Sequence, residues 1–482
     1  MLQQIILAYT LTDIVIRIVM TPVILRRRFT AQRALLWLMV VYLLPIPGTV
    51  LYFLLGRQFI GSRRKKAYAA RQKDHPEPEA SKRLRQQKRE TPAVPPSQVP
   101  TLRLAEAMSG NEILGGNTVS YLAEVDDLAD RLVAEIHKAE HHVHLLFYIL
   151  IVDRVGRRVL DAAAEATGRG VAVRILADDV GSKQFTDDKA MREWRERGLD
   201  IRPAMSVGRI RRRLARFDLR NHRKLAVIDG RAGFAGSHNL VTQDYHGTNG
   251  PMGSTVDLSA EFAGPIVGQL QRAFIDDWFF ETGHLLDSEA YFPTLESVGD
   301  VAGHVVPTGP TDESETYRRV LIAALGSALD RVVISTPYLI PDEPTLLALS
   351  LCAQRGVEVS LIVPKKLDKP LVEFASHAYY GRLLESGIRI FRHRENLIHA
   401  KTITVDDHLA LVGSANLDVR SFELNFELTI LLYGEKPTRQ LREIQQRYLD
   451  NSDAVKLEDW HGSRPTWKFY AERAAALCSP LL

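Results

Sequence analysis

The sequence predicts an α/β protein in which two similar domains form a pseudo-two-fold pair, preceded by two hydrophobic membrane helices. Three observations predict this fold class: an apolar N-terminus, strand-like runs that alternate with helical patterns in both halves, and one chemical motif that occurs twice. A chain of 482 residues is too long for one ordinary domain, and its near-average composition indicates buried cores.

The two hydrophobic segments, residues 3–25 and 34–55, are each long enough to cross a bilayer as a helix. The second carries no charge and has aromatic residues near its ends, which suits membrane interfaces. The first contains Asp13 and Arg17, which lie one helical turn apart and can pair. Because no basic region precedes the first segment and no small-residue cleavage site follows it, we expect residues 1–60 to be a membrane anchor.

Basic residues gather beside this anchor. Residues 26–33 hold four Arg and no acid, and residues 57–90 hold twelve Lys or Arg against four Asp or Glu. With a net charge of +4, about −8 is left for residues 91–482. The positive-inside rule favours the cytoplasm for both basic stretches, although a single crossing separates them. Either the longer stretch decides and the following domains are cytoplasmic, or Pro45, Pro47 and Gly48 break the second segment into a re-entrant hairpin.

Residues 61–100 are predicted to be a basic, solvated linker. This stretch contains six prolines among many Lys, Arg, Gln and Glu residues, which argues against one regular helix.

From residue 101 onward the chain repeats its pattern of elements. Helical patterns at 125–139 and 157–167 alternate with apolar runs at 143–151 and 170–176. In the second half, helical patterns at 317–328 and 343–353 alternate with apolar runs at 331–339 and 356–362. Such alternation indicates βαβ units and a mostly parallel sheet covered by helices. We therefore expect two α/β domains, near 101–298 and 299–482, that face each other.

Each predicted domain carries one copy of the motif H-x-K-x(4)-D-x(6)-G-S-x-N. The first copy contains His222, Lys224, Asp229, Ser237 and Asn239, and the second, 177 residues later, contains His399, Lys401, Asp406, Ser414 and Asn416. One copy alone would be a weak signal. Two copies with identical spacing, embedded in a wider repeat, indicate a site with two-fold pseudo-symmetry.

This set of side chains suits a phosphodiester. One neutral imidazole can attack phosphorus to form a phosphohistidine, and an imidazolium on the other side can protonate the leaving oxygen. Lys224 and Lys401 offer ammonium groups to the equatorial oxygens. The remaining predicted donors to these oxygens are neutral: Ser237, Asn239, Ser414 and Asn416.

Four candidate carboxylates lie in or just after the two motif copies. Glu427 and Asp257 follow the two asparagines in strand-like segments, so either could accept from the distal imidazole nitrogen. Asp229 and Asp406 have either a direct role in the site or a structural one. We expect no metal and no other cofactor, because the lysines supply the positive charge. With only Cys352 and Cys478, the chain also excludes a disulfide framework and a cysteine-based zinc site.

An arginine cluster precedes the first motif. Arg209, Arg211, Arg212, Arg213, Arg216, Arg220 and Arg223 interleave with apolar residues. The cluster is either a solvated face or a basic lip over a site for anionic lipid.

The paired motif resembles that of the phospholipase D superfamily, and more closely that of bacterial cardiolipin synthases. The resemblance extends over nearly the whole chain, including residues 43–57, 220–224, 335–338, 413–422, 424–427 and 479–482. It implies a membrane enzyme that moves a phosphatidyl group from one phosphatidylglycerol to the hydroxyl of another and releases glycerol.

The same resemblance implies roles and surroundings. The motif positions His222, Lys224, Asp229, His399, Lys401 and Asp406 would carry the active site, with His222 as nucleophile and His399 as general acid. Phosphatidylglycerol and other anionic phospholipids would be the partners. The protein would be a multi-pass protein of the bacterial inner membrane with its catalytic domains on the cytoplasmic side.

Three alternatives stay open. A hydrolytic phospholipase D would share the first half-reaction and use water as acceptor. A nuclease of the same superfamily is disfavoured by the apolar segments and by the charge of about −8 over residues 91–482. A catalytically dead scaffold is disfavoured because both histidines and both lysines are intact.

Overall fold

The computed structural model describes residues 2–27, 31–56, 93–206, 219–246, 254–310, 315–367, 369–394, 397–462, 465–477 and 479. These residues form two compact units, an N-terminal unit of residues 2–56 and a large unit that begins at residue 93. Residues 57–92, the arginines at 209–216 and the terminus 480–482 lie outside the described residues, and so do the predictions made for them. The end of the predicted linker 61–100 is described and is helical: Pro96–Gln98 form a 3-10 turn, and a helix begins at Val99.

The N-terminal unit contains α1 (Leu2–Leu25), α2 (Ala31–Leu43), α3 (Pro45–Leu51) and the π-helical turn η1 (Tyr52–Gly56). The predicted first segment matches α1, and Asp13 and Arg17 pair at 2.8 Å. The second segment is not one continuous helix; it breaks at Pro45, one of the residues at which the alternative prediction placed a break. None of the helices in the described residues is both long and apolar enough to cross a bilayer.

The break in the second segment has a local cause. Pro45 cannot donate the backbone hydrogen bond that would continue α2, so a new helix starts there. The chain then returns so closely on itself that a Cβ on Gly48 would lie 2.4 Å from the backbone oxygen of Val40. Met20, Ile24, Val41 and Tyr52 form the small core of this unit.

The large unit is built on one 15-stranded sheet that both halves share. The first half supplies β1 (Leu114–Leu122), β2 (His142–Phe147), β3 (Ala172–Asp178), β4 (Asp200–Ala204), β5 (Leu225–Ile228), β6 (Ala232–Gly236) and β8 (Ser259–Ala263). The second half supplies β9 (Val301–Thr308), β10 (Arg331–Ser335), β12 (Glu358–Pro364), β13 (Arg389–His393), β15 (Thr402–Val405), β16 (Leu409–Gly413), β18 (Glu427–Tyr433) and β19 (Ser452–Ala454). The strand order is β19-β13-β12-β10-β15-β16-β18-β9-β1-β8-β6-β5-β2-β3-β4.

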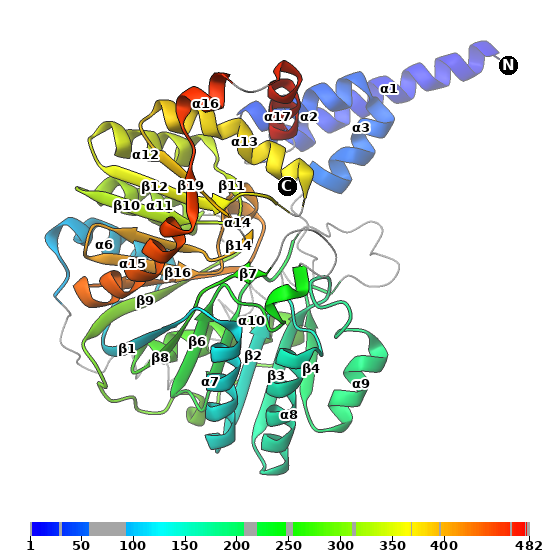
Figure 1. The fold of residues 1–482 in the computed structure, drawn as a ribbon. Coiled ribbons are helices and arrows are strands. Elements are labelled where there is room, and N and C mark those ends of the chain that lie inside the picture. Colours follow the sequence, from blue (N-terminus) through cyan, green and yellow to red (C-terminus); the bar gives the residue numbers. More distant parts are fainter. Residues whose placement is uncertain are drawn as a thin grey trace. The chain divides into compact units, whose positions relative to one another are not determined.

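This strand order shows the repeat directly. From the centre outward, β1-β8-β6-β5-β2-β3-β4 of the first half mirrors β9-β18-β16-β15-β10-β12-β13 of the second. The halves join where β1 pairs antiparallel with β9, so a pseudo-two-fold relation is built into the sheet (Figure 1). The domain boundary expected at 298/299 stays a prediction; β9 begins three residues after residue 298.

The expectation of a mostly parallel sheet is wrong. Within the described part of the large sheet, the parallel neighbours are β2–β3, β3–β4, β10–β12 and β12–β13, and the others are antiparallel. The reason is that the strand after each H-x-K run returns at once through a tight turn, as β5–β6 and β15–β16. Tight turns can join only antiparallel strands.

Helices cover both faces of the sheet (Figure 1). One face packs against α10 (Ile266–Thr282) and α15 (Glu435–Asp450), whose apolar side chains form one core with strands of both halves. The other face of the first half packs against α7 (Val125–Lys138), α8 (Arg154–Gly168) and α9 (Asp188–Glu196). The other face of the second half packs against α6 (Val99–Ser109), α11 (Thr316–Ser327) and α12 (Glu343–Gln354). The helices predicted at 125–139, 157–167, 317–328 and 343–353 are confirmed within a few residues.

The glycine of each G-S-x-N run is required by close packing between strands. A Cβ on Gly236 would lie 2.4 Å from the Cα of Ser259, and a Cβ on Gly413 would lie 2.2 Å from the backbone oxygen of Leu428. The two glycines therefore let β6 approach β8, which begins two residues after Asp257, and let β16 approach β18, which begins with Glu427.

We predict that Gly236→Ala and Gly413→Ala each lower the free energy of unfolding by about 1–3 kcal/mol, because the added methyl forces the backbones apart. Gly326→Ala is the matched control, since Gly326 lies in α11 with open space around it. Its stability should be unchanged or slightly raised. Thermal unfolding in detergent measures all three, and wild-type stability in either motif variant would contradict the packing argument.

Candidate active site

The two H-x-K runs are each held by backbone bonds from the opposite half. The N–H of His222 donates to the backbone oxygen of Phe426 at 2.9 Å, and the N–H of Phe426 donates to that of Arg220 at 2.9 Å. In the second copy, the short strand β14 (Leu397–Ile398) pairs with β7 (Thr255–Val256), and the N–H of His399 donates to the oxygen of Val256 at 2.7 Å. Each histidine therefore lies just before its strand, and its backbone N–H is held by a carbonyl of the other half.

The imidazole rings are oriented across the same boundary. Nδ1 of His222 lies 3.1 Å from Oε2 of Glu427, and Nδ1 of His399 lies 2.7 Å from Oδ1 of Asp257. A carboxylate that accepts at Nδ1 fixes the tautomer in which Nε2 keeps its lone pair. The structure thus brings together the two predicted histidine–carboxylate pairs, with each carboxylate supplied by the half that does not contain its histidine.

Burial sets the protonation of these pairs. It lowers the pKa of His222 to about 4 and that of His399 to about 3, because taking an imidazolium out of water outweighs the attraction of the facing carboxylate. Burial alone would raise the pKa of Asp257 and Glu427, but the facing imidazoles outweigh it and hold both values below the ordinary range. At neutral pH the site without substrate therefore holds two neutral imidazoles and two carboxylates.

Both lysines are buried beside their histidines. Nζ of Lys224 donates to the backbone oxygen of His222 at 2.6 Å, and Nζ of Lys401 donates to that of His399. Burial lowers the pKa of Lys401 to about 8. It lowers the pKa of Lys224 well below the ordinary value, with added repulsion from Lys401, so the two ammonium groups share one site.

The motif serines hold the carboxylates. The hydroxyl of Ser237 donates to Asp257 at 2.6 Å, and that of Ser414 donates to Glu427 at 2.5 Å. Their predicted role as phosphate ligands is therefore corrected, because each hydroxyl proton is engaged by an anion of its own half. The asparagines are buried nearby: the amide oxygen of Asn239 accepts from the N–H of Ile149 at 3.1 Å. The amide nitrogen of Asn416 donates to Asp418 at 3.1 Å.

The motif aspartates lie at the far end of their strands, and their predicted catalytic role is wrong. Asp229 and Asp406 occupy the turns after β5 and β15 with φ of 50° and 48°. The carboxylate of Asp229 accepts from the backbone N–H groups of residues 140, 141 and 142 at 2.7–2.9 Å. That of Asp406 accepts from those of residues 329, 330 and 331 at 2.8–3.2 Å. Of the two roles open to them, the structural one is observed.

The geometry is accompanied by clear relationships to known proteins. A sequence model described as "Cardiolipin synthase, PLD-like domain" matches residues 132–278 and 321–449. One described as "Phospholipase_D-nuclease N-terminal" matches residues 7–57. Cardiolipin synthase A of Yersinia pseudotuberculosis serotype O:1b (strain IP 31758) and that of Yersinia pestis are 33% identical over 470 residues, 95% of this chain and 95% of each relative. The chain belongs to the cardiolipin synthase family. The predicted family is confirmed.

The fold of this cardiolipin synthase family member also has a solved relative. Phosphatidylserine synthase of Haemophilus influenzae Rd KW20 matches with a TM-score of 0.61 at 14% identity, covering 80% of this chain and 100% of that one. At this identity the match shows the shared fold.

Arg223, which was predicted to lie in a surface cluster of arginines, is buried and hydrogen-bonded to both halves. Nη1 of Arg223 donates to Asp277 at 2.7 Å, Nε donates to the backbone oxygen of Glu427 at 3.0 Å, and Nη2 donates to that of Thr308 at 2.8 Å. Arg220 is buried too, so neither residue belongs to a solvated face or a lip. The motif itself could have indicated that Arg223 is buried. The equivalent position between His and Lys in the second copy is the small apolar residue Ala400.

Aromatic and acidic neighbours complete the first copy. The ring of Tyr148 meets that of His222 edge-on at 4.9 Å, and Nζ of Lys224 lies 5.2 Å from the Tyr148 ring centre. Asp178 ends β3 in a turn and accepts from the N–H groups of Val180, Gly181 and Asn221. Asp178 is therefore a structural turn residue.

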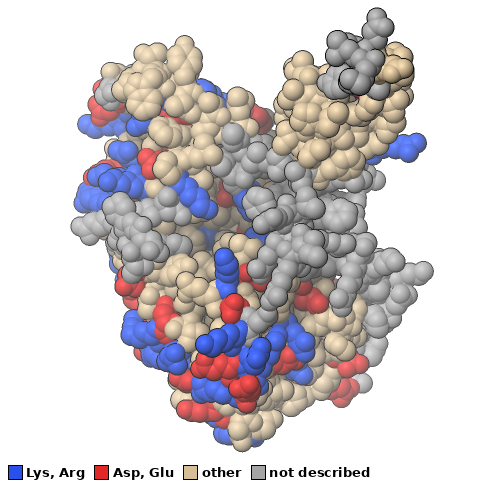
Figure 2. All heavy atoms as spheres, turned by 90° about the vertical axis from the view of Figure 1, so that its right-hand side faces the viewer, with Lys and Arg blue, Asp and Glu red and all other residues tan. Residues whose placement is uncertain are grey.

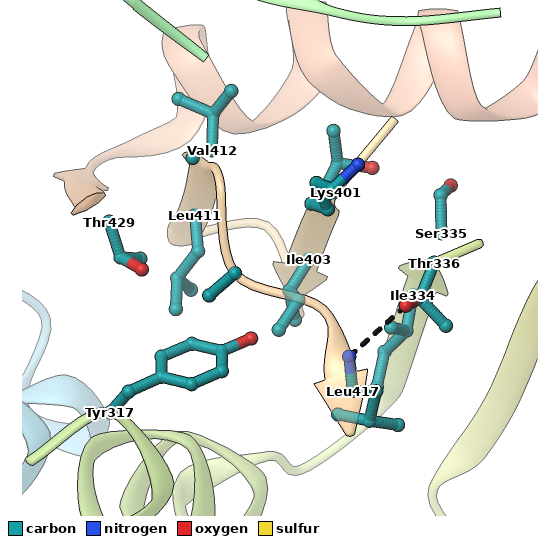
Figure 3. A pocket seen from close by; sticks show the side chains of 13 residues that line it. Tyr317, Ile334, Ser335, Thr336, Lys401, Ile403, Leu411, Val412, Leu417 and Thr429 are labelled. Atoms are coloured by element: carbon teal, nitrogen blue, oxygen red, sulfur yellow. Dashed lines mark hydrogen bonds between the residues drawn. The ribbon is translucent and has the colours of Figure 1, made fainter. Parts of the chain in front are cut away.

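A small cavity lies behind Lys401 on the core side of the second half. It encloses about 10 Å³ and is lined mainly by strand residues, with Tyr317 on the side away from Lys401 (Figure 3). The backbone N–H of Leu417 donates to the Thr336 hydroxyl at its border, at 3.1 Å. This volume holds at most about one water molecule, so it is too small for a phospholipid headgroup.

We predict that Asp229→Ala and Asp406→Ala lower the free energy of unfolding by about 2–4 kcal/mol, because three backbone donors lose their acceptor in each case. The folded fraction should keep its turnover number. Asp229→Asn and Asp406→Asn are the controls, since an amide keeps one acceptor and tolerates positive φ. Thermal unfolding and specific activity of the folded protein test this; a fully folded alanine variant without activity would restore the catalytic role.

Proposed function

We propose that the chain makes cardiolipin from two phosphatidylglycerol molecules and releases glycerol. The observation that carries the proposal is the pair of neutral, buried imidazoles, each with its Nδ1 held by a carboxylate of the opposite half. With Nδ1 engaged in this way, the reactive nitrogen of each ring is Nε2, and we assign one Nε2 as nucleophile and the other as proton carrier at the same phosphorus. The family membership and the printed activity of the relatives, cardiolipin synthase A, support the lipid substrate.

In the first step, Nε2 of His222 attacks the phosphorus of one phosphatidylglycerol. The new N–P bond replaces the bond to the glycerol headgroup, and the departing oxygen takes a proton from His399. An empty site holds His399 neutral, because burial lowers its pKa to about 3. The anionic phosphodiester favours the imidazolium, so the proton enters with the substrate. Lys224 and Lys401 stabilise the charge on the equatorial oxygens, and Asn239 and Asn416 add neutral donors.

In the second step, the hydroxyl of another phosphatidylglycerol attacks the phosphohistidine. His399 is now neutral and accepts the hydroxyl proton, while the N–P bond to His222 breaks. The product is cardiolipin. His222 is neutral again, and His399 carries a proton as it did in the substrate complex; that proton leaves when the anionic product leaves. Water in place of the lipid hydroxyl would give phosphatidic acid, which is the second candidate function. The names of the relatives favour transfer.

Charge supports a lipid over a nucleic acid. Residues 91–482 carry about −8, and the surface of the first half mixes acidic and basic side chains (the lower part of Figure 2). Ion pairs such as Arg154–Asp126 and Arg197–Asp161 account for this mixture. A long polyanion needs a continuous basic track, whereas one phosphodiester needs only the two lysines of the site.

The N-terminal unit is proposed to attach the enzyme to the bacterial inner membrane as a multi-pass anchor, with the large unit on the cytoplasmic side. Its helices expose many large apolar side chains, among them Leu7, Leu11, Ile18, Leu36 and Leu43. The one charged pair within α1, Asp13–Arg17, is mutually neutralised at 2.8 Å. This orientation follows the positive-inside rule if the longer basic stretch, residues 57–90 that precede the large unit, decides over the shorter one at 26–33.

The direct test incubates the purified full chain with labelled phosphatidylglycerol in mixed micelles. We predict cardiolipin and glycerol in equal amounts; phosphatidic acid alone would establish hydrolysis instead. His399→Asn should slow glycerol release by about 10²–10⁴-fold and still allow phosphorylation of His222 from a donor with a good leaving group. Acid-labile phosphohistidine trapped at His399, with none at His222, would reverse the two roles.

Substitutions of Glu427 and Asp257 should slow the reaction for different reasons, since one residue orients the nucleophile and the other the proton carrier. Glu427→Gln should slow formation of the phosphohistidine whatever the leaving group, because the nucleophile loses its orienting anion. Asp257→Asn should be rescued by a nitrophenyl leaving group, which needs no proton from His399. The burst of nitrophenolate measures the first step in both variants.

Glu261→Gln is the matched control for these variants. Glu261 lies in β8 and pairs with Arg131 at 2.6 Å, away from the histidines, so full activity is expected. Equal rescue of both carboxylate variants by the nitrophenyl donor would contradict the separate roles.

A further inference from the structure

The C-terminal helix α17 (Thr466–Leu477) presents an unusually apolar outer face. The exposed fractions of Trp467, Tyr470 and Leu477 are 64%, 67% and 84%, and that of Phe469 is 49%. Spacings of three and seven residues put Trp467, Tyr470 and Leu477 on one side of the helix. The opposite side, with Glu472 and Ala475, is buried.

The charges of α17 are sorted between these two sides. Its acidic residue, Glu472, is buried with its carboxylate 3.7 Å from Nδ1 of His377 in α13 (Pro370–Glu385). The exposed Arg473 places its guanidinium 5.4 Å from the ring centre of Phe469. The outer face therefore combines large aromatic groups with a cation and carries no exposed carboxylate. This is the composition of helices that lie in the interface of an anionic bilayer.

The position of α17 connects this face to the site. Ala475 packs with Val372 and Ala375 of α13 and with Ile340 of the short strand β11 (Leu339–Ile340). β11 pairs with β17 (Leu417–Asp418), which directly follows the second G-S-x-N run. In Figure 1, α17 lies against α13 over this end of the second half. Two contacts thus connect α17 to Asn416: α17 packs against β11, and β11 pairs with β17, which follows Asn416 in the chain.

We propose that the docking face of α17, defined as Trp467, Phe469, Tyr470, Arg473 and Leu477, lies in the headgroup region of an anionic bilayer. It is a membrane contact of the large unit, separate from the N-terminal anchor. The contact holds the Asn416 edge of the site at the surface that supplies diacyl phospholipids. The inference rests on the proposed function only in that the substrate is a bilayer lipid.

The free energy of this face is lower in the headgroup region of a bilayer than in water. Trp and Tyr have an apolar body and a polar edge, so the headgroup region satisfies both parts. Arg473 adds attraction to anionic lipid that falls with salt. With Glu472 turned inward, no carboxylate of α17 opposes that attraction.

The test uses the full chain and vesicles of phosphatidylglycerol and phosphatidylcholine in equal parts. With brominated acyl chains, the emission of Trp467, taken as the difference between the parent and Trp467→Phe, should be quenched. The triple variant Trp467→Ser, Tyr470→Ser and Leu477→Ser should raise the KM for vesicle phosphatidylglycerol by about tenfold. Its kcat on short-chain, monomeric phosphatidylglycerol should stay unchanged.

The chain offers a matched control in α12. Leu347 and Leu351 are exposed at 60% and 49%, and Leu347→Ser with Leu351→Ser should leave both substrates unaffected. Absence of bromolipid quenching, or an unchanged vesicle KM in the triple variant, would overturn the proposal. Loss of activity on both substrates would instead assign the face to packing within the chain, and a change in oligomeric state would assign it to a second copy.

These outcomes are separable from the proposed reaction. If the parent makes no cardiolipin from either form of phosphatidylglycerol, the proposed function fails. The quenching of Trp467 still decides whether α17 touches the bilayer.

Discussion

The exchange of carboxylates between the two halves is the constraint on which the rest of this structure depends. Asp257 of the first half orients His399 of the second, and Glu427 of the second orients His222 of the first. A buried carboxylate is costly unless it is hydrogen-bonded, and here each accepts from a serine of its own half and from a histidine of the other half. The halves must therefore dock before either histidine is usable. The shared sheet, the common core under α10 and α15, and the backbone bonds from Phe426 and Val256 all hold that docking.

The same arrangement explains why an anion is the natural occupant. Two carboxylates, two imidazoles and two lysines share a buried site, and burial disfavours every charged form that lacks a partner. The imidazoles are neutral, with pKa values lowered to about 4 and 3, and the pKa of Lys401 is lowered to about 8. The two ammonium groups repel each other across the site. A phosphodiester between them relieves that repulsion and favours a proton on one imidazole, so binding itself prepares the acid that the proposed first step requires.

The repeat is symmetric in its scaffold and asymmetric in its chemistry. Glu427 accepts from Ser414, Ser421 and Asn425 in addition to His222, whereas Asp257 accepts from Ser237 in addition to His399. Arg223 adds a clamp across the halves that Ala400 cannot reproduce. These differences fall on the two histidines unequally, which is what a division into nucleophile and proton carrier needs, and the shared glycine contacts keep the strand geometry equal in both.

The sequence by itself determined the repeat, the residue types of the site, the family and most helices and strands of the large unit, because periodicity and motif spacing are local properties. It also identified Glu427 and Asp257 as histidine partners, but only the tertiary structure decided that each serves the opposite half, since that depends on pairing between distant strands. The tertiary structure also decided three other points. Asp229 and Asp406 lie in turns at the far ends of their strands, the motif serines donate to the carboxylates, and Arg223 is buried. The lysine and the aspartate of each motif copy are five residues apart, about 16 Å along an extended strand at about 3.3 Å per residue, so residues close together in a motif need not share a site. The antiparallel majority of the sheet was not predicted for a related reason: apolar runs reveal burial, whereas strand direction is fixed by the turns. The break at Pro45 was one of two alternatives from the sequence, and the structure decided for it because proline lacks the backbone donor that would continue the helix.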